Sequence, residues 1–194
     1  MKKFLAVAGL AVLMAVPSLA ATSTWNLDPM HSNAQFVVRH LGISNVQGEF
    51  TKISGTVMLD DSDITKSTVD VTIDATSIDT RVSRRDDDLK SDGFFDVAKF
   101  PTITFKSTKI EKAGEGKLKV TGDLTIKGVT KSVVLQVTGP GAVDTHMGTR
   151  RGFSAMTTID RTDFGVSKDP APMIGNDIAI QIDCEMVLPA PPKQ

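Results

Sequence analysis

Strict alternation of apolar and polar residues is the feature that most constrains the fold of this chain. It is clearest from Val69 to Thr76, where Val69, Val71, Ile73 and Ala75 share one phase and acidic or hydroxyl residues take the other. Successive side chains of a β-strand point to opposite faces of the sheet. The segment is therefore predicted to be a strand with one dry face and one wet face.

About nine runs of this kind follow one another along the chain. Short turn signals at 114–116 and 127–130 and a glycine-proline loop at 139–141 separate some of them. Antiparallel neighbours joined by short turns, each with one buried face, fit a closed up-and-down barrel or a sandwich. We favour an all-β barrel of about eight strands, because Gly48 and Gly55 offer bends for closure and no Cys-Trp-Cys sandwich framework is present.

One charged segment interrupts the alternation, between residues 84 and 106. Its first part, 83–91, is predicted to be a helix of about two turns with its initial serine as the N-cap. A helix with so few apolar residues does not belong in a core. We therefore expect a short helical insertion between two strands that acts as a lid, with Leu89, Phe94 and Phe95 turned toward the barrel and the charges toward solvent.

The N-terminal segment has the pattern of a secretory signal peptide. Two lysines precede an apolar run at 4–16, and small residues follow up to Ala20. We expect residues 1–20 to be removed on export, and residues 21–194 to form a single domain in the periplasm of a Gram-negative source. The run is shorter than the roughly 20 apolar residues of a membrane span, so stable membrane insertion is not expected.

Composition narrows the possible partners. The chain has 22 basic and 23 acidic residues, 5% aromatic residues and no tyrosine, which argues against binding nucleic acid. Its single cysteine, Cys184, lies in an alternating run, so we predict a buried, inert thiol rather than a nucleophile, and no intrachain disulfide.

The interior phase of the predicted barrel is almost entirely apolar. A barrel of about eight strands is just wide enough to enclose a slender ligand. Valine, isoleucine, leucine, alanine, glycine and a few phenylalanines make up this phase, so an enclosed ligand should be apolar and chain-like. The residues alone leave a second alternative open, in which these side chains simply fill the barrel.

Four ordered motifs resemble those of the YceI-like family of polyisoprenoid-binding periplasmic proteins. The resemblance covers nearly all of the mature chain and rests on WNLDPMHS at 25–32 with matching positions up to Phe50, RDDDLKSDGFFDVAKFPTITF at 85–105, GDLTIKGVTK at 122–131 and RTDFGV at 161–166. The family often carries histidine where this chain has Asp88. That departure argues against a histidine role at this position and leaves the fold inference untouched.

The resemblance implies a lipocalin-like antiparallel barrel, usually a homodimer, whose apolar tunnel holds the tail of an isoprenoid lipid or quinone. It implies no enzymatic reaction and no catalytic cofactor. By strand phase, and with His40 as a polar group that meets a ligand headgroup at the tunnel mouth, we expect the ligand-binding residues to be Phe36, Val38, His40, Val71, Ile73, Leu89, Phe94, Phe95, Ile103, Phe105, Leu124, Leu135, Phe153, Ile159, Ile180 and Ile182.

Two polar groupings carry alternative interpretations. Asp28, His31 and Ser32 have the residue types of a nucleophile site, but their place on a tight turn favours turn capping by Asp28 and Ser32. His31 and His40 are candidate metal ligands, yet no spacing supplies the remaining ligands. We assign no catalytic and no metal-binding residue.

Three function classes follow. The favoured one is a periplasmic carrier that encloses an isoprenoid tail, and the alternatives are a hydrolase or isomerase acting on such a lipid and a stress-related barrel without a native ligand. An enzyme would place at least two titratable groups in the interior phase, whereas only His40 falls there clearly.

Overall fold

The computed structural model describes residues 22–146 and 148–188, so the predicted signal peptide lies outside the described residues. The strands are β1 (Thr22–Leu27), β2 (Asn33–His40), β3 (Ser44–Phe50), β4 (Ile53–Asp60), β5 (Thr68–Asp74), β6 (Ile78–Asp79), β7 (Thr102–Lys112), β8 (Lys117–Ile126), β9 (Val129–Thr145), β10 (Gly148–Asp160) and β11 (Ile174–Val187). Helix α1 spans Ser83–Lys90, and the 3-10 helices are η1 (Ile64–Lys66), η2 (Ala75–Ser77) and η3 (Arg161–Phe164).

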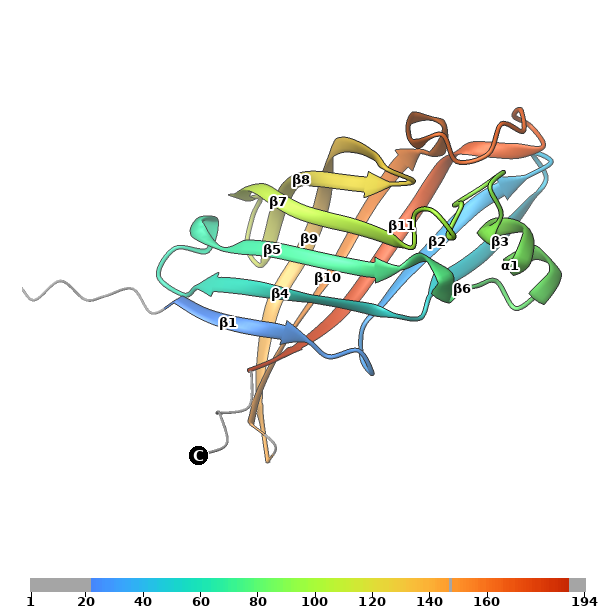
Figure 1. The fold of residues 1–194 in the computed structure, drawn as a ribbon. Helices are drawn as coiled ribbons and strands as arrows, with labels where there is room; N and C mark the ends of the chain where they lie inside the picture. The colour runs from blue at the N-terminus through green and yellow to red at the C-terminus, as the bar shows by residue number, and fades with distance from the viewer. Residues whose placement is uncertain (1–21, 147, 189–194) are drawn as a thin grey trace, which may run out of the picture.

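The strands form a closed antiparallel barrel, as predicted (Figure 1). The ring of eight runs β1-β4-β5-β7-β8-β9-β10-β11 and closes where β1 pairs with β11. Every pairing between neighbours is antiparallel, because short turns join most consecutive strands. The fold is therefore the lipocalin-like up-and-down barrel that the alternation and the resemblance indicated.

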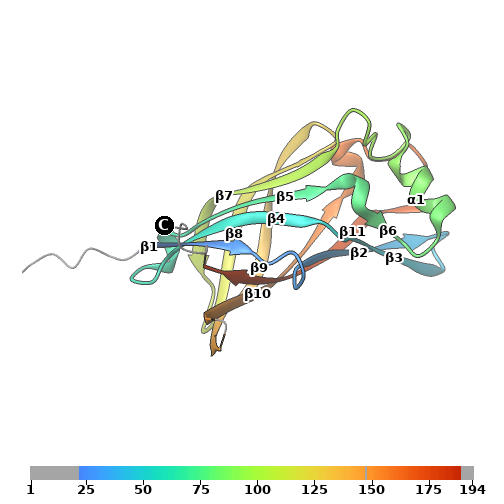
Figure 2. The ribbon, with the colours of Figure 1, turned by 60° about the horizontal axis from the view of Figure 1, so that its bottom comes forward.

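Of the three strands outside the ring, β2 and β3 belong to interrupted spans at one end of the barrel, and β6 pairs with β3. Strands β1 and β2 both pair with β11, and β4 and β3 pair in turn with β1 and β2. The chain thus makes two long spans, broken at 28–32 and at 51–52, so that the hairpin β2–β3 diverges from the β1–β4 pair. Figure 2 shows this hairpin extending toward the end of the molecule that carries α1.

The interruption of the second span does not fall at Gly48 or Gly55. Gly48 and Gly55 lie inside β3 and β4, and the break falls at Thr51 and Lys52, whose backbone N–H groups donate to the carbonyl and the hydroxyl of Ser77. A Cβ atom on Gly48 would lie 2.5 Å from the ring of Phe36. Close packing against Phe36 therefore requires a glycine at this position.

Two local predictions were wrong. The segment 139–141 is not a loop but part of β9, at a register irregularity opposite β10. Helix α1 begins at Ser83, so its N-cap is Val82, and no side chain caps it. Asp86 instead turns back to accept hydrogen bonds from the backbone N–H and the hydroxyl of Thr80, at 2.8 and 2.6 Å. This contact fixes the helix to the residues just after β6.

No helix in the described ranges, 22–146 and 148–188, is long and apolar enough to cross a membrane.

Candidate functional site

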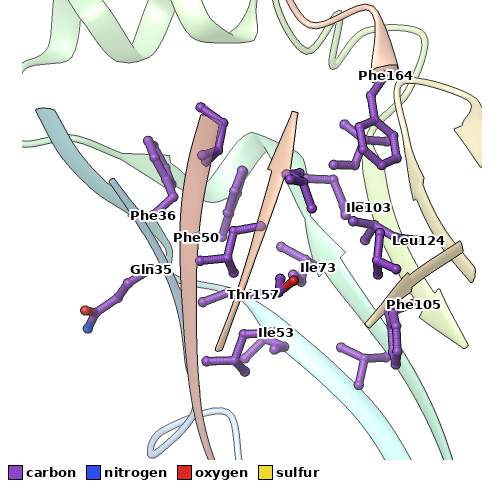
Figure 3. Close-up of a pocket in the computed structure, with 18 of the residues that line it drawn as sticks. Gln35, Phe36, Phe50, Ile53, Ile73, Ile103, Phe105, Leu124, Thr157 and Phe164 are labelled. Carbon is purple, nitrogen blue, oxygen red and sulfur yellow. The ribbon is translucent and has the colours of Figure 1, made fainter. Parts of the chain in front are cut away.

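A cavity of about 170 Å³ lies inside the barrel (Figure 3). Side chains from β2, β3, β4, β5, β7, β8, β9, β10 and β11 line its walls, and Leu89, Phe94 and Phe95 line it from the helical insertion. The interior faces are half-buried or buried because alternating residues turn inward along each strand. The cavity thus arises directly from the alternation seen in the sequence.

The predicted ligand-binding residues gather around this one cavity, with a single exception. Those that line it are Phe36, Val38, Val71, Ile73, Leu89, Phe94, Phe95, Ile103, Phe105, Leu124, Leu135, Phe153, Ile159, Ile180 and Ile182. Their contact with a ligand stays a prediction.

His40 is the exception: it is not among the described residues that line the cavity, and its place at the tunnel mouth stays a prediction. The residue is exposed at the end of β2, where it pairs with Ser44 across the hairpin and with Ile174 of β11. The register between β11 and β2 shifts between Ile174 and Ile178. Strand β2 keeps its register with β3 through His40, and Ile174, the partner of His40 on β11, lines the cavity.

Other lining residues escaped the sequence reasoning. Phe50 and Ile53 flank the break between β3 and β4, and Phe164 lies in η3, where the period of two does not apply. Ile178 is in phase with Ile180 and Ile182, so extension of that run by one step would have found it. Figure 3 shows Phe36 and Phe50 side by side at one wall of the cavity.

The insertion covers the cavity as a lid. The rings of Phe50 and Phe95 meet edge to face with centroids 5.6 Å apart, a favourable aromatic geometry. The Phe95 N–H donates to the Leu89 carbonyl at 3.0 Å, which ties the end of the insertion back to the helix. Lys127 Nζ donates to the carbonyl of Asp92 at 2.8 Å. The lid is thereby attached to the β8–β9 turn as well as to the core.

Polar groups at the cavity wall have partners in the protein. The Thr157 hydroxyl donates to the Val134 carbonyl at 2.9 Å. Arg161, only 4% exposed, directs its guanidinium at backbone carbonyls of the segment 166–175, with donor-acceptor distances of 2.6 to 3.0 Å. Its charge is thus held by the loop and not offered to the cavity. Arg161 begins the RTDFGV motif at 161–166, but the motif did not indicate this role.

Cys184 also lines the cavity, and burial raises the pKa of its thiol to about 11. A thiol with so high a pKa carries almost no thiolate at neutral pH. The predicted burial of Cys184 is confirmed, and the raised pKa agrees with the predicted inert thiol.

The turn at 28–32 is an ion-pair cluster. Asp28 Oδ1 accepts from the Met30 N–H at 3.0 Å, while Oδ2 lies 3.1 Å from His31 Nδ1 and 2.7 Å from Arg150 Nη1. The bond with His31, followed by that of Met30, lowers the pKa of Asp28 to about 2, and Arg150 adds to the shift. Capping by Asp28 is confirmed.

Ser32 does not complete a nucleophile site at this turn. Its hydroxyl bonds the backbone of Glu185 on β11, with Oγ 3.4 Å from the carbonyl oxygen and 3.3 Å from the N–H. It thus ties the turn to β11 and does not cap it, which corrects the prediction for this residue.

His31 has carboxylate neighbours that the sequence spacing did not reveal. Its ring, Asp28 and Glu185 offer atoms within 4.8 Å of one another, the kind of grouping that a cation can use. The guanidinium of Arg150 already occupies the Asp28 oxygen that such a cation would need. His40, at the far end of β2, is not part of the group.

Comparison with known proteins identifies relatives of the whole barrel. The model of the YceI-like domain matches residues 25–186. A UPF0312 protein of Vibrio parahaemolyticus is 38% identical over 186 residues, which cover 94% of this chain and 96% of that protein.

Solved structures resemble the fold. The crystal structure of Burkholderia cenocepacia BcnA superposes with a TM-score of 0.74 at 26% identity and covers 82% of this chain and 98% of that one. A polyisoprenoid binding domain from Saccharophagus degradans, implicated in plant cell wall breakdown, superposes with a TM-score of 0.64 at 15% identity over 87% of this chain and 100% of that one. Since the family model spans the whole barrel, the chain belongs to the YceI-like family.

Proposed function

We propose that this protein is a binding and carrier protein for an isoprenoid lipid or quinone, whose tail it encloses in the barrel. The observation that carries this proposal is the cavity wall, which is apolar except at Gln35, Thr104, Thr157 and Arg161. Gln35 points away from the cavity in Figure 3. A site of this composition favours a ligand without polar groups along its length.

Energetics support an isoprenoid tail. Each buried CH₂ group contributes about 0.8 kcal/mol, so a single five-carbon unit contributes a few kcal/mol. Apolar cavities of about 150 Å³ accept a guest the size of benzene. A cavity of about 170 Å³ therefore has room for one or two such units before any side chain moves. The description of the Saccharophagus degradans domain as polyisoprenoid binding agrees with this ligand class.

The cavity wall favours binding over catalysis. Among the described lining residues, the titratable side chains are Arg161 and Cys184. The donors of Arg161 are engaged by backbone carbonyls, and the pKa of Cys184 is about 11. Neither group is placed for general acid or base chemistry at neutral pH.

The ligand is tested by organic extraction of the protein purified from its native host, followed by mass spectrometry. We expect to recover a prenyl lipid or quinone. Ile73→Trp should lower the recovered amount at least tenfold, because the larger ring fills the cavity. Met156→Trp is the matched control, since it adds the same ring on the exposed face of β10 and should leave the amount unchanged.

Repeated recovery of no lipid from the folded wild-type protein would contradict the carrier and favour the barrel without a native ligand. Equal recovery from Ile73→Trp and wild type would show that the lipid binds elsewhere.

The proposed place of action is the periplasm, from the signal peptide pattern at 1–20. Fractionation of the native host and N-terminal sequencing of the protein test this, with a mature chain beginning at Ala21 or Thr22 as the expected result.

A further inference from the structure

A second cavity of about 50 Å³ follows the first along the barrel. On β7 the first cavity takes Ile103 and the second takes Ile110, and on β9 the first takes Val133 and the second takes Val137. The second cavity therefore lies toward the end of the barrel that is farther from the lid. The two cavities thus lie one after the other along the barrel, as the binding site of a linear chain would.

The second cavity is as apolar as the first. Its one polar side chain is Ser67, whose hydroxyl accepts a hydrogen bond from the Asp60 N–H at 3.0 Å. A water molecule needs several polar partners, and this wall offers none that is unpaired. The space is suited to hydrocarbon.

Four residues belong to the walls of both cavities and form a partition between them: Val69, Phe105, Leu135 and Phe153. Figure 3 shows Phe105 at the opposite end of the first cavity from Phe164. The two rings of the partition come from β7 and β10. Their positions determine whether the cavities are separate or continuous.

One glycine lies close beside each of these two phenylalanines. The ring of Phe105 lies directly against Gly122, which leaves no space for a Cβ atom there. Phe153 lies opposite the irregularity of β9, with its Cα and Cβ atoms 3.1 Å from the Cβ position of Gly139. These glycines let both phenylalanines pack closely against the neighbouring strand.

We infer that the second cavity is a subsite for the distal end of an isoprenoid chain, and that Phe105 and Phe153 set the chain length that the protein prefers. The inference rests on the proposed function. The first cavity holds only one or two units, and a polar headgroup stays in water at the lid end. A longer tail then enters the barrel more deeply and passes the partition into the second cavity.

The test measures dissociation constants for linear prenyl alcohols of two to six isoprene units, by displacement of an apolar fluorescent dye from the full mature protein. Wild-type affinity should rise with chain length and then level off. In Phe105→Ala the affinity should level off at chains at least one unit longer than in wild type. The longest chains should bind at least about tenfold more tightly than they bind wild type. In Phe105→Trp the affinity should level off at shorter chains than in wild type.

Phe36→Ala is the control, because Phe36 lines the first cavity alone. It should weaken binding of all chains by a similar factor without moving the point of levelling. Since removal of a large core side chain costs stability, Phe105→Leu is measured beside Phe105→Ala, and folding of each variant is verified by circular dichroism.

An unchanged point of levelling in the folded Phe105 variants would overturn the inference and leave the proposed function intact. Failure of the folded wild-type protein to bind any of the alcohols would overturn both.

Discussion

At the scale of single residues, Asp28 secures the break between β1 and β2. Its carboxylate holds the turn through Met30 and His31 and reaches across to Arg150 on β10. The negative charge is stabilised by these donors, which is why the pKa of Asp28 falls to about 2 from an ordinary value of 3.8.

This pKa predicts how stability depends on pH. A folded pKa below the unfolded one contributes stability above pH 4 that is lost as pH falls from about 4 to about 2. We expect Asp28→Asn to lower the free energy of unfolding by roughly 1 to 2 kcal/mol at pH 7 and to have almost no effect at pH 2. Urea unfolding across this pH range measures the difference.

Asp61→Asn serves as the control, because Asp61 is paired with the neighbouring Arg151 but is 52% exposed. Exposed pairs contribute little, so its effect should stay below about 1 kcal/mol at every pH. A difference between Asp28→Asn and wild type that persists at pH 2 would show that the turn depends on shape and not on charge.

Much of the cavity wall could be predicted residue by residue. Alternation identifies the inward phase of β5, β7 and β11, so residues such as Ile73, Phe105 and Ile180 were found from the sequence. Alternation does not say where a strand extends past the cavity, which is why His40 was grouped with residues that line the wall although it is not one of the described lining residues. It also cannot find Arg161, whose partners are carbonyls of a loop that only folding brings near.

At the scale of elements, Arg161 organises the connection between η3 and β11. From one buried position, its guanidinium donates hydrogen bonds to the backbone carbonyls of residues 166, 167, 169, 174 and 175. Buried carbonyls left without a donor are costly, so the path of this loop depends on a single side chain.

We therefore expect Arg161→Met to lower the free energy of unfolding by about 3 kcal/mol or more, as measured by chemical denaturation. Arg39→Met is a matched control, since Arg39 donates to the Gly42 carbonyl and to Asn45 from an exposed position. Its effect should be about 1 kcal/mol or less. Equal losses in the two variants would mean that water replaces the buried guanidinium.

The elements themselves were only partly predictable. The lid helix could be predicted because its charges break the alternation. Its N-terminus is held by Thr80, which lies before the helix and is not part of a helical sequence pattern. The glycine-proline segment at 139–141 has the composition of a loop. It is nevertheless part of β9, because β10 continues beside it. The local sequence does not show which strand will be its neighbour.

At the scale of the whole molecule, the barrel has one short seam. Strand β1 meets β11 only at Asn26 with Val187 and at Leu27 with Met186, whereas β10 pairs with β11 from Arg150 to Asp160. The β1 part of the closure therefore depends on a small part of the backbone ladder, supported by the core around Met186, while β2 pairs with the rest of β11 beyond the turn at 28–32.

Hydrogen exchange should reveal this difference. We expect backbone amides at the seam to exchange at least about tenfold faster than those in the middle of the β10–β11 ladder, because a short ladder opens without global unfolding. Nuclear magnetic resonance of the purified protein measures both sets in one experiment. Seam amides as slow as the slowest amides of the barrel would show that closure is as cooperative as the rest of the fold.

The fluorescence of the single tryptophan can be used to follow closure of the barrel. Trp25 is buried in β1 beside the seam, with its ring 5.2 Å from the Arg151 guanidinium carbon and its indole N–H donating to Ser23. It belongs to neither cavity wall. The fluorescence of Trp25 should therefore change when the barrel opens. A ligand that enters or leaves the cavities does not contact its ring.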